Sequence, residues 1–514
     1  MILIMATGTS PGDDTWGEIT RRHRKAASRV ISTRKRRNYV GGNWVESESR
    51  QTFKTHDPTT GDVLAEVQAG AEKDIDRAVS AAWDAYRNRW ADRSAADRQA
   101  VLNAIADRVE DNKEKFATLD TLDNGKPITE ARGDIDLFVD QFRYFAGACR
   151  SHGGTTLQAE DDHHIQTHHE PYGVVGQIIP WNFPMLMTAW KLAPALATGN
   201  AVVLKPAEET PLSVLELLRE VEDVIPPGVV NVVTGHGPEA GSALVRHEDV
   251  RKIAFTGSTE VGKGVMKGAA SNVTDVTLEL GGKSPVIVYP DVAVEKAVDI
   301  ATRAMFFNNG ECCSAGSRLF VHEEIAEAFL DAYVAEIEGL ELGDPLQETT
   351  DLGPQITPSQ ANKTMQYVRS LHEDEMQVLT GGYEPEEDPL GKGCFVAPTL
   401  IADIDHDARA VQEEIFGPVQ TVFTWSEYDE LIDRANDVDY GLAAGIITED
   451  INQAHETAAD LEAGNIWVNT YNRFPAGQAF GGTKQSGIGR EVAAETLGEY
   501  TQTKTVTIGL EDQQ

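Results

Sequence analysis

The chain has 514 residues, 41% hydrophobic and 25% charged, so it is long enough for roughly two or three domains with a large core and is not intrinsically disordered. Asp and Glu number 82 against 45 Lys and Arg, and the resulting net charge of −37 argues against nucleic acids and anionic membranes as partners. No apolar run reaches the about 18 residues that a transmembrane helix needs.

The acidic residues are spread along the chain, which contains only 18 lysines. Such a surface suits a cytoplasm of high salt concentration, where counterions screen self-repulsion, and an ordinary acidic enzyme is the alternative. We favour the halophilic interpretation because no single tail holds the excess of acid. The four cysteines, at 149, 312, 313 and 394, show neither a disulfide framework nor a metal-binding spacing, so we expect a reduced, cytoplasmic protein.

Residues 1–37 differ from the rest, because they hold nine Lys or Arg against three acidic residues. A basic segment with Ser and Thr can be a targeting peptide or an anion-binding arm, although the stretch from Met1 to Met5 is too short for a signal-peptide core. We expect a disordered extension. Residues 38–514 then carry 36 basic and 79 acidic residues, a net charge of −43.

From Asn38 the chain alternates between short apolar segments and segments with the 3.6-residue periodicity of helices. This alternation predicts an α/β fold with parallel sheets covered on both faces. The expected strands include Val174–Ile179, Ala201–Leu204, Val229–Val233, Lys252–Phe255 and Pro285–Val288, and the expected helices include Ile75–Trp90, Arg98–Asp111 and Pro211–Val224.

Two of the expected strands end in polar residues. The segment 178–184, IIPWNFP, ends a strand in a rigid loop that holds Asn182, and an Asn amide can donate a hydrogen bond to a developing oxyanion. The segment 201–211, AVVLKPAEETP, delivers Lys205 and Glu208 at the carboxyl end of a buried strand, where doubly wound sheets bind nucleotides.

Two glycine-containing segments follow. The run from Gly235 to Gly241 does not fit the GxGxxG pattern, and we interpret it as a turn. The segment 255–262, FTGSTEVG, is predicted to be a strand, a turn at Gly257 and a helix start, where backbone N–H groups can meet a pyrophosphate.

A lone acidic residue, Glu279, lies in the apolar segment 276–285, VTLELGGKSP. Burial would raise its pKa toward the working pH, which suits a general base, and the alternative is a structural Glu paired with a Lys. The pair Gly281 and Gly282 favours a site, because such turns let the backbone approach a ligand.

The segment 306–316, FFNNGECCSAG, places Cys312 and Cys313 in a polar, glycine-containing turn after an apolar helix. A cysteine in such a turn can be exposed and deprotonated, since positive potential lowers a thiol pKa below its usual value of about 8.5. The alternative is a pair of small buried cysteines.

The histidines at 163, 164, 168 and 169 cluster like metal ligands, but no acidic or Cys partner has ligand spacing. We therefore expect a solvated loop and no metal site. His236 and His247 are expected in loops, and neither is given a role.

The order and spacing of these motifs resemble the aldehyde dehydrogenase superfamily from about Asn38 to about Gly509. The resemblance also includes EEIFGPV at 413–419 and FGGTKQSGIGRE at 480–491. It implies an enzyme that oxidises an aldehyde to its carboxylic acid with NAD(P)+. The implied fold has a Rossmann-type cofactor domain, an α/β catalytic domain and a small β arm for oligomerisation.

The resemblance implies that Cys313 is the nucleophile, which forms a thiohemiacetal and then a thioester. Asn182 and the backbone N–H of Cys313 would hold the oxyanion, and Glu279 would activate the water that hydrolyses the thioester. Relatives that acylate CoA generally lack this glutamate, so we expect a free acid as the product.

For the cofactor, the resemblance assigns Lys205 and Glu208 to the adenine ribose. NAD is expected, because Glu208 would repel a 2′-phosphate, but the nearby Lys205 leaves NADP possible. The remaining cofactor residues implied are Gly257 and Ser258 at the pyrophosphate, Glu414 and Phe416 at the nicotinamide ribose, and Trp181 and Ile179 lining the site.

The implied domains are a cofactor domain over 38–148 and 171–281, and a catalytic domain over 282–485. Residues 149–170 and 486–514 would form the oligomerisation arm and the C-terminal segment. Pairing of sheets between subunits implies a homodimer or homotetramer.

The substrate positions of the family are mostly apolar and aromatic here, and they are Phe183, Met187, Trp190, Phe307, Cys312, Ser314, Phe474 and Phe480. Semialdehyde enzymes often carry Arg where Trp190 stands, so a carboxylate-bearing aldehyde is not expected. Phe183, Trp190 and Phe474 partly match the cation–π cage of betaine aldehyde enzymes, which makes that subtype an alternative. A binding protein of this fold without catalysis is disfavoured, since Cys313, Glu279 and Asn182 are all present.

Overall fold

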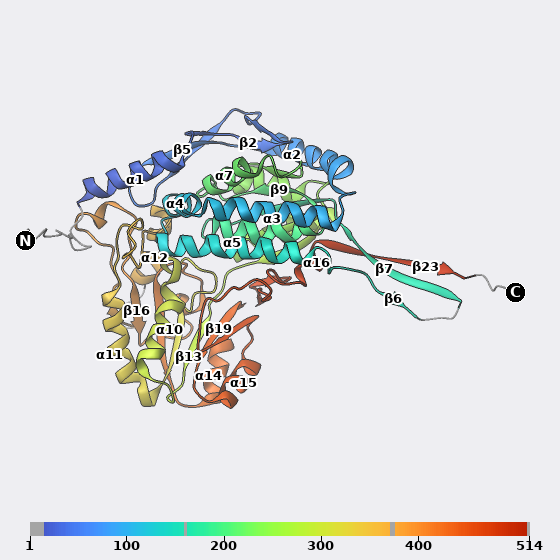
Figure 1. Cartoon of the computed structure of the whole chain (residues 1–514). Helices are drawn as coiled ribbons and strands as arrows, with labels where there is room; N and C mark the ends of the chain where they lie inside the picture. The colour runs from blue at the N-terminus through green and yellow to red at the C-terminus, as the bar shows by residue number, and fades with distance from the viewer. Residues whose placement is uncertain (1–14, 159–161, 371–375, 511–514) are drawn as a thin grey trace, which may run out of the picture.

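The structure, a computed structural model, describes residues 15–158, 162–370 and 376–510. Figure 1 shows two bodies, each built around one sheet, and an arm that projects away from both. The chain passes from the first sheet to the second through residues 280–284.

The first sheet has eight strands in the order β22-β12-β11-β8-β9-β10-β2-β3. The strands from β12 to β10 run parallel, whereas β22, β2 and β3 are antiparallel to their neighbours. The strand bounds are β2 (Asn38–Val40), β3 (Asn43–Val45), β8 (Val174–Ile178), β9 (Ala201–Lys205), β10 (Val230–Val232), β11 (Lys252–Thr256), β12 (Asp275–Glu279) and β22 (Gly487–Ile488).

Helices cover both faces of this sheet, as the apolar strands predict. In β9, Val202 and Leu204 pack toward α3, α5, α6 and α7, while Ala201 and Val203 pack toward α2, α8 and α9. The helix bounds are α2 (Glu72–Ala85), α3 (Ala95–Asp111), α4 (Lys113–Asn124), α5 (Ile128–Ala148), α6 (Pro184–Ala197), α7 (Leu212–Val221), α8 (Ser242–Arg246) and α9 (Thr259–Ala269).

The second sheet has seven strands in the order β15-β16-β17-β14-β13-β19-β20, parallel from β16 onward. Helices α10 and α11 cover the face of Val286 and Leu319, and α12 and α14 cover the face of Ile287 and Phe320. The bounds are β13 (Pro285–Val288), β14 (Arg318–His322), β15 (Gln377–Thr380), β16 (Thr399–Ala402), β17 (Val419–Trp425), β19 (Ala443–Ile447), β20 (Asn465–Val468), α10 (Val294–Phe306), α11 (Glu323–Gly339), α12 (Pro358–Arg369), α13 (Arg409–Gln412), α14 (Tyr428–Asn436) and α15 (Ile451–Asp460).

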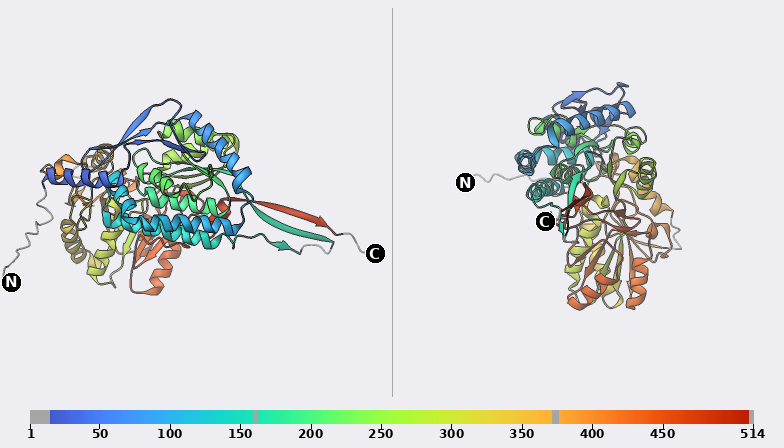
Figure 2. Two further views of the ribbon diagram at one scale, coloured as in Figure 1. Left: turned by 45° about the horizontal axis from the view of Figure 1, so that its top comes forward. Right: turned by 90° about the vertical axis from the view of Figure 1, so that its right-hand side faces the viewer.

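The arm consists of β6 (Thr156–Leu157), β7 (His163–Pro171) and β23 (Thr501–Gly509), and it projects from the body in Figure 1 and in the left view of Figure 2. Strand β23 pairs antiparallel with β7 along its whole length. The histidines of residues 163–169 therefore lie in a paired strand, and the expectation of a solvated loop is wrong. Among the described residues, no cluster of His, Cys, Asp or Glu could hold a metal ion.

The N-terminal segment was expected to be disordered, and for its described part that expectation is wrong. Helix α1 (Trp16–Val30) begins with a capping box between Thr15 and Glu18, buries Ile19 and Val30, and packs against α4. Strand β1 (Lys35–Arg36) then joins a small sheet with β5 (Val63–Gln68) and β4 (Thr52–His56). The basic composition of this segment suggested disorder, although it contains an amphipathic helix. Residues 1–14 lie outside the described part.

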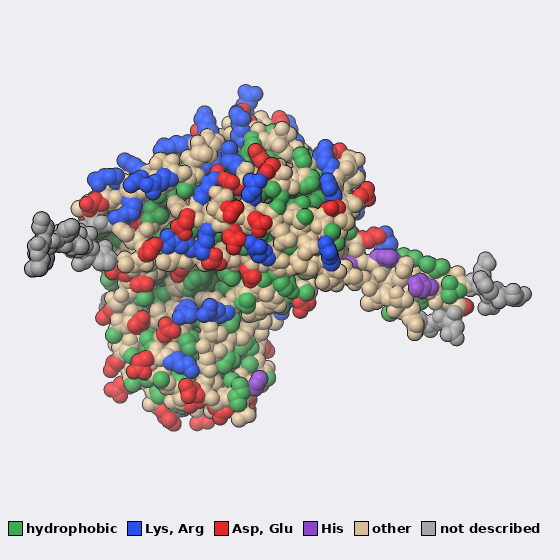
Figure 3. Space-filling model, viewed as in Figure 1, with side chains coloured by type: hydrophobic (Ala, Val, Ile, Leu, Met, Phe, Trp, Pro, Cys, Tyr) green, Lys and Arg blue, Asp and Glu red, His purple; other side chains and the backbone are tan. Residues whose placement is uncertain are grey.

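Charged side chains are unevenly distributed over the surface. On the face in Figure 3, Lys and Arg gather over the body that contains α1, whereas Asp and Glu dominate the lower body. Residues 282–485 hold 37 acidic and 11 basic residues, so the lower body carries most of the negative charge. In the described part of the chain, none of the helices has both the length and the apolar character needed to cross a bilayer.

Candidate active site

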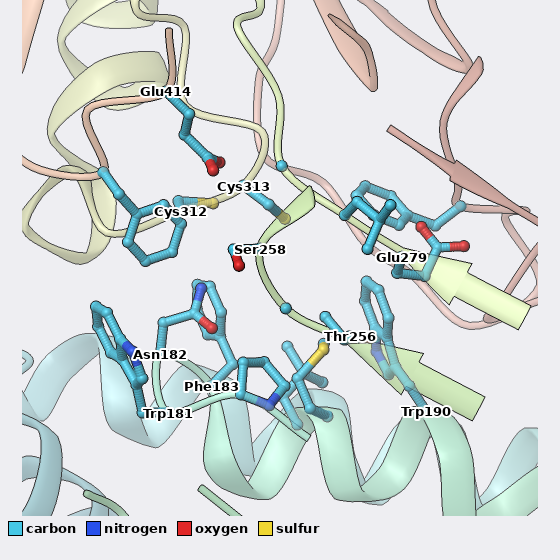
Figure 4. A pocket seen from close by; sticks show the side chains of 18 of the residues that line it. Trp181, Asn182, Phe183, Trp190, Thr256, Ser258, Glu279, Cys312, Cys313 and Glu414 are labelled. Carbon is cyan, nitrogen blue, oxygen red and sulfur yellow. The ribbon is translucent and has the colours of Figure 1, made fainter. Parts of the chain in front are cut away.

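A cavity of about 180 Å³ contains most of the residues that the sequence singled out (Figure 4). It is lined by strand ends and loops from both sheets, together with α6. The predicted residues that line it are Trp181, Asn182, Phe183, Met187, Trp190, Gly257, Ser258, Glu279, Cys312, Cys313, Glu414, Phe416, Phe474 and Phe480. The cavity thus brings together segments that are up to about 300 residues apart in the sequence.

Further lining residues were not predicted. They are Pro180, Leu186, Thr256, Leu280, Gln360 and Lys363, whereas Gly281, which also lines the cavity, belongs to the glycine pair that the sequence associated with a site. Pro180, Leu186, Thr256 and Leu280 adjoin or lie within predicted segments. Gln360 and Lys363 lie on α12 and reach the cavity only through tertiary packing, so no local pattern could have identified them.

The cysteine loop, residues 307–316, begins with an unusual turn after α10. Asn308, Asn309 and Gly310 all have positive φ angles, 53°, 59° and 69°, a region that non-glycine residues rarely adopt. Hydrogen bonds hold the turn: the Asn308 N–H donates to Glu130 Oε2 at 2.9 Å, and the Gly353 N–H donates to Asn309 Oδ1 at 2.7 Å. The loop is therefore fixed by its surroundings before a substrate arrives.

The two cysteines of this loop have different surroundings. Cys312 is buried, and its Sγ lies 3.2 Å from Ser314 Oγ, which in turn donates to Asn472 Oδ1 at 2.9 Å. Cys313 is partly exposed and lines the cavity. A hydrogen bond with the Cys312 thiol, burial and the nearby carboxylates of Glu414 and Glu279 hold the pKa of Cys313 well above its ordinary value. The resting thiol is therefore protonated, in contrast to the lowered pKa expected from the sequence.

Glu279 ends β12 and faces the cavity, and it is 4% exposed. Neither of its carboxylate oxygens has a hydrogen-bond partner among the described residues, so a structural pairing with Lys is not found. Burial first, and then the negative charge of Glu491, raise the pKa of Glu279 well above its ordinary value, against the opposing charge of Lys191. Lys191 and Glu491 form a buried ion pair at 2.6 Å.

Asn182 is buried beside the cysteine loop. Its Nδ2 donates to the backbone carbonyl of Glu311 at 3.0 Å, and the same carbonyl accepts from Asn308 Nδ2 at 2.9 Å. One hydrogen of the Asn182 amide is thus used for positioning, which leaves the other for a ligand in the cavity.

The two glycines after Glu279 allow other parts of the site to approach. A side chain at Gly281 would collide with Glu414 Oε2 at 2.2 Å, and one at Gly282 would collide with the Cys313 carbonyl at 2.6 Å. The Gly282 N–H donates to Glu414 Oε1 at 3.2 Å, and burial raises the pKa of Glu414 to about 7. The absence of side chains at Gly281 and Gly282 therefore lets the Glu414 carboxyl group and the backbone of Cys313 pack close to this turn.

A second polar group lies at the carboxyl edge of the first sheet; Lys205, Glu208 and Ile179 are outside the cavity lining, whereas Ser258 belongs to it. Lys205 Nζ donates to Glu208 Oε2 at 2.9 Å, and the Ile179 N–H donates to the Lys205 carbonyl at 3.2 Å. Ser258 caps the start of α9, with its Oγ accepting from the Val261 N–H at 3.4 Å. These residues come from β8, β9 and β11, which are neighbours in the sheet.

Aromatic rings surround one side of the cavity. The Trp190 ring lies 5.1 Å from that of Phe480 and 6.1 Å from that of Phe474, and Phe474 lies 5.6 Å from Phe480. Phe307 is placed behind this lining, with its ring stacked on Phe183 at 5.9 Å, and Ser314 is likewise behind Cys312. The two predicted pocket residues Phe307 and Ser314 therefore support the wall instead of lining it.

Comparison with known proteins places the chain among enzymes. The family model described as "Aldehyde dehydrogenase family" matches residues 44–506. The chain is 46% identical to the mitochondrial benzaldehyde dehydrogenase of Antirrhinum majus, over 92% of this chain and 89% of that protein. It superimposes on the NAD+ complex of an aldehyde dehydrogenase from Bacillus cereus with a TM-score of 0.92, at 42% identity over 95% of this chain and 99% of the other. A betaine aldehyde dehydrogenase from Staphylococcus aureus, also in complex with NAD+, gives a TM-score of 0.93, at 38% identity over 96% and 98% of the two chains.

Proposed function

The chain belongs to the aldehyde dehydrogenase family and oxidises aldehydes with NAD(P)+, and on this premise we propose that Cys313 is the nucleophile. Support comes from its position as a partly exposed thiol that lines one cavity with Glu279 and Asn182. The Cys313 thiol gives up its proton to water in the cavity, the sulfur forms a bond to the aldehyde carbon, and the electron pair of the carbonyl bond moves to the oxygen, which becomes negatively charged. The Asn182 amide and the Cys313 backbone N–H stabilise that oxyanion.

The residues at the carboxyl edge of the first sheet fit NAD. When bound, NAD+ supplies a hydride acceptor and a positive charge beside the thiol. The start of α9 at Ser258 suits the pyrophosphate, and Lys205 with Glu208 suits the adenine ribose. Glu414 and Phe416 are assigned to the nicotinamide ribose. Because the Glu208 carboxylate accepts from a 2′-hydroxyl and repels a 2′-phosphate, NAD is the preferred cofactor.

The observation that carries the proposal is the buried carboxyl group of Glu279, which has no partner among the described residues and faces the same cavity as Cys313. After the hydride leaves the substrate carbon, Cys313 holds a thioester. Glu279 takes a proton from water as the water oxygen attacks the thioester carbon, and the carbon–sulfur bond breaks. The products are a free carboxylic acid and the restored thiol group of Cys313.

The cavity favours an uncharged, apolar aldehyde, because Trp190, Phe474 and Phe480 form one wall of it. Arg473 is exposed and does not line the cavity, and the one cationic residue found among the lining residues, Lys363, comes from α12 and not from the aromatic wall. Aromatic and medium-length aliphatic aldehydes are therefore the proposed substrates. The similarity to benzaldehyde dehydrogenase is consistent with this class.

A second candidate is betaine aldehyde. The rings of Phe183, Trp190 and Phe474 all line the cavity and offer faces to a quaternary ammonium group, and a betaine aldehyde dehydrogenase is among the similar structures. The two candidates differ in charge, so their relative kcat/KM values separate them.

The test is turnover by the purified protein with benzaldehyde, hexanal, betaine aldehyde and succinic semialdehyde. We expect NADH and free acid in equal amounts, no requirement for CoA, and the highest kcat/KM for an uncharged aldehyde. Higher kcat/KM for betaine aldehyde would establish the second candidate. Cofactor binding without turnover of any aldehyde would instead indicate a binding protein that has kept the fold.

We also propose the assembly and the compartment. Residues 38–148 and 171–281, which hold seven of the eight strands of the first sheet, form the cofactor domain, and residues 282–485 form the catalytic domain. The arm pairs subunits into a homodimer or homotetramer, because it projects from the body and leaves Leu157 and Ile508 about half exposed. Chemistry at Cys313 needs a reduced thiol, which suits the cytoplasm.

A further inference from the structure

His236 is next to the proposed adenine-ribose residues but is not used by the reaction described above. It precedes η3 (Gly237–Gly241), in the segment that follows β10, and β10 is the parallel neighbour of β9. The carboxyl ends of the two strands meet at one edge of the sheet, so Lys205, Glu208 and His236 lie together. His236 Nδ1 lies 3.6 Å from Glu208 Oε1, and the His236 side chain is 47% exposed.

Glu208 is held from three sides. Its Oε2 accepts from Lys205 Nζ at 2.9 Å, and its Oε1 accepts from the Gly237 N–H at 3.4 Å and faces the His236 ring. The Glu208 side chain is 29% exposed, so one part of the carboxylate is still open to a ligand.

The charged groups around His236 belong to two segments of the chain. Lys205, Glu208 and Glu209 belong to β9 and the residues after it, and Glu239 belongs to η3. Strand β4 contributes a neutral group, the ring of Phe53, whose centroid lies 5.0 Å from that of His236. Of these groups, the imidazole is the one that can face Glu208 either as a neutral ring or as a cation with two N–H donors.

A neutral His236 leaves Glu208 with a single cationic partner, Lys205. A 2′-hydroxyl can then donate to the carboxylate, whereas a 2′-phosphate meets its negative charge. A protonated His236 offsets part of the Glu208 charge and offers an N–H donor to an anion at the same place. Both effects favour the 2′-phosphate, and both depend on one proton.

We propose that His236 makes the choice between the two cofactors depend on pH, because its imidazole lies beside Glu208 at the ribose edge and admits the 2′-phosphate of NADP only when protonated. The inference rests on the proposed role of Lys205 and Glu208 in binding the adenine ribose. At alkaline pH the enzyme is specific for NAD, and it tolerates NADP increasingly as the pH falls.

Fluorescence titration with NADH and NADPH, without aldehyde, tests the inference through binding alone. The measured quantity is the ratio of the Kd for NADPH to the Kd for NADH. For the unmodified protein we expect this ratio to fall roughly fivefold between about pH 8.5 and about pH 6. His236→Gln should remove this fall, and His236→Arg should keep the ratio low at both pH values.

Two comparisons make the result specific. The 2′-phosphate itself gains a proton near about pH 6, which opposes the expected trend and is measured by the His236→Gln protein. His455 is an exposed histidine on α15 in the other body, and His455→Gln should behave like the unmodified protein.

A His236→Gln protein that keeps the full pH dependence would overturn the inference. The cofactor assignment would still stand if Glu208→Gln tightened NADPH binding relative to NADH. If Glu208→Gln left both Kd values unchanged, the proposed ribose site would itself be wrong, and the inference would fall with it.

Discussion

The two adjacent thiols of the cysteine loop are chemically alike but differ in access. Cys313 borders the cavity, whereas Cys312 is 4% exposed and its sulfur is within hydrogen-bond distance of Ser314. Both side chains line the cavity, but Cys313 is the more exposed, so we expect Cys313 to attack the substrate carbon and Cys312 to shape the cavity wall.

Replacing each cysteine separately tests this difference. Cys313→Ala should lower kcat by at least about 10⁴-fold, because no covalent intermediate can form, while NADH binding stays intact. Cys312→Ala should change mainly KM, by enlarging the cavity. Steady-state kinetics with several aldehydes measures both, and similar losses of kcat in the two proteins would contradict the assignment of Cys313.

The charge next to Glu279 should set the pH dependence of thioester hydrolysis. Glu279 must lose its proton to act as a base, and its pKa is held high by burial and by Glu491. The hydrolysis rate should therefore rise with pH. Glu491→Gln removes the repelling charge and leaves Lys191 nearby, so the midpoint should move to lower pH by about one unit. An unchanged midpoint in the rate of acid formation would show that Glu491 does not act on the base.

At the scale of elements, the apolar strands were predicted well. Pro285–Val288 has the predicted bounds, and Val174–Ile178, Ala201–Lys205 and Lys252–Thr256 differ from prediction by one residue at one end. These strands are buried on both faces, so their local sequence is dominated by apolar residues and ends abruptly in Pro, Gly or charged residues. The polar residues at their ends could be located for the same reason.

Other features depended on contacts that no local pattern records. The α-helix predicted over 75–90 ends at Ala85. It is followed by a short π-helix, η2 (Tyr86–Trp90), in which Trp90 is buried. The positive φ angles of Asn308 and Asn309 depend on Glu130 and Gly353. The raised pKa of Cys313 reflects first the hydrogen bond with its neighbour Cys312 and burial, and then the charge of Glu414, which is about a hundred residues away in the sequence.

Helix α1 is an element whose attachment should depend on pH. His23 is buried, with Nδ1 2.6 Å from Asp57 and Nε2 2.8 Å from Asp344, so it joins α1 to two distant parts of the chain. Burial alone would lower its pKa, but the two carboxylates outweigh it and raise the pKa of His23 to about 9.

The pKa of His23 in the folded protein lies above the ordinary value of about 6.5. The ion pairs of His23 therefore stabilise the fold fully below about pH 6.5, and this stabilisation is lost as the pH rises through about 9. It amounts to at most about 3 kcal/mol. The melting temperature of the unmodified protein should fall over this range, and trypsin should cleave α1 faster. His23→Gln should be less stable at neutral pH and should lose the pH dependence. A His23→Gln protein with the same pH dependence would contradict the role of His23, and His455→Gln is the control.

At the scale of the whole molecule, the concentration of negative charge should make the assembly depend on salt. Along α11 alone, the exposed residues Glu327, Asp331 and Glu336 have no ion-pair partner among the described residues. Like charges repel over about 30 Å at 0.01 M salt but over only about 3 Å at 1 M. Repulsion of this kind opposes both the compact fold and contact between subunits.

The melting temperature and the oligomer size should therefore rise between about 0.1 M and about 2 M KCl. Replacing Glu327, Asp331 and Glu336 by Gln, Asn and Gln should reduce the salt needed. Thermal melts and light scattering provide the two measurements. Constant values across the salt range would show that the acidic surface serves solubility alone.

The central claim is that Cys313 forms a thioester that Glu279 hydrolyses, and a Glu279→Gln protein tests it most directly. Mixed with NAD+ and an aromatic aldehyde, this protein should form about one NADH per subunit and then stop, since hydride transfer does not need the carboxylate. Mass spectrometry of the stalled protein should find the acyl group on the peptide that contains Cys313, attached to that residue. Continued turnover at the unmodified rate, or an acyl group on Cys312, would contradict the account.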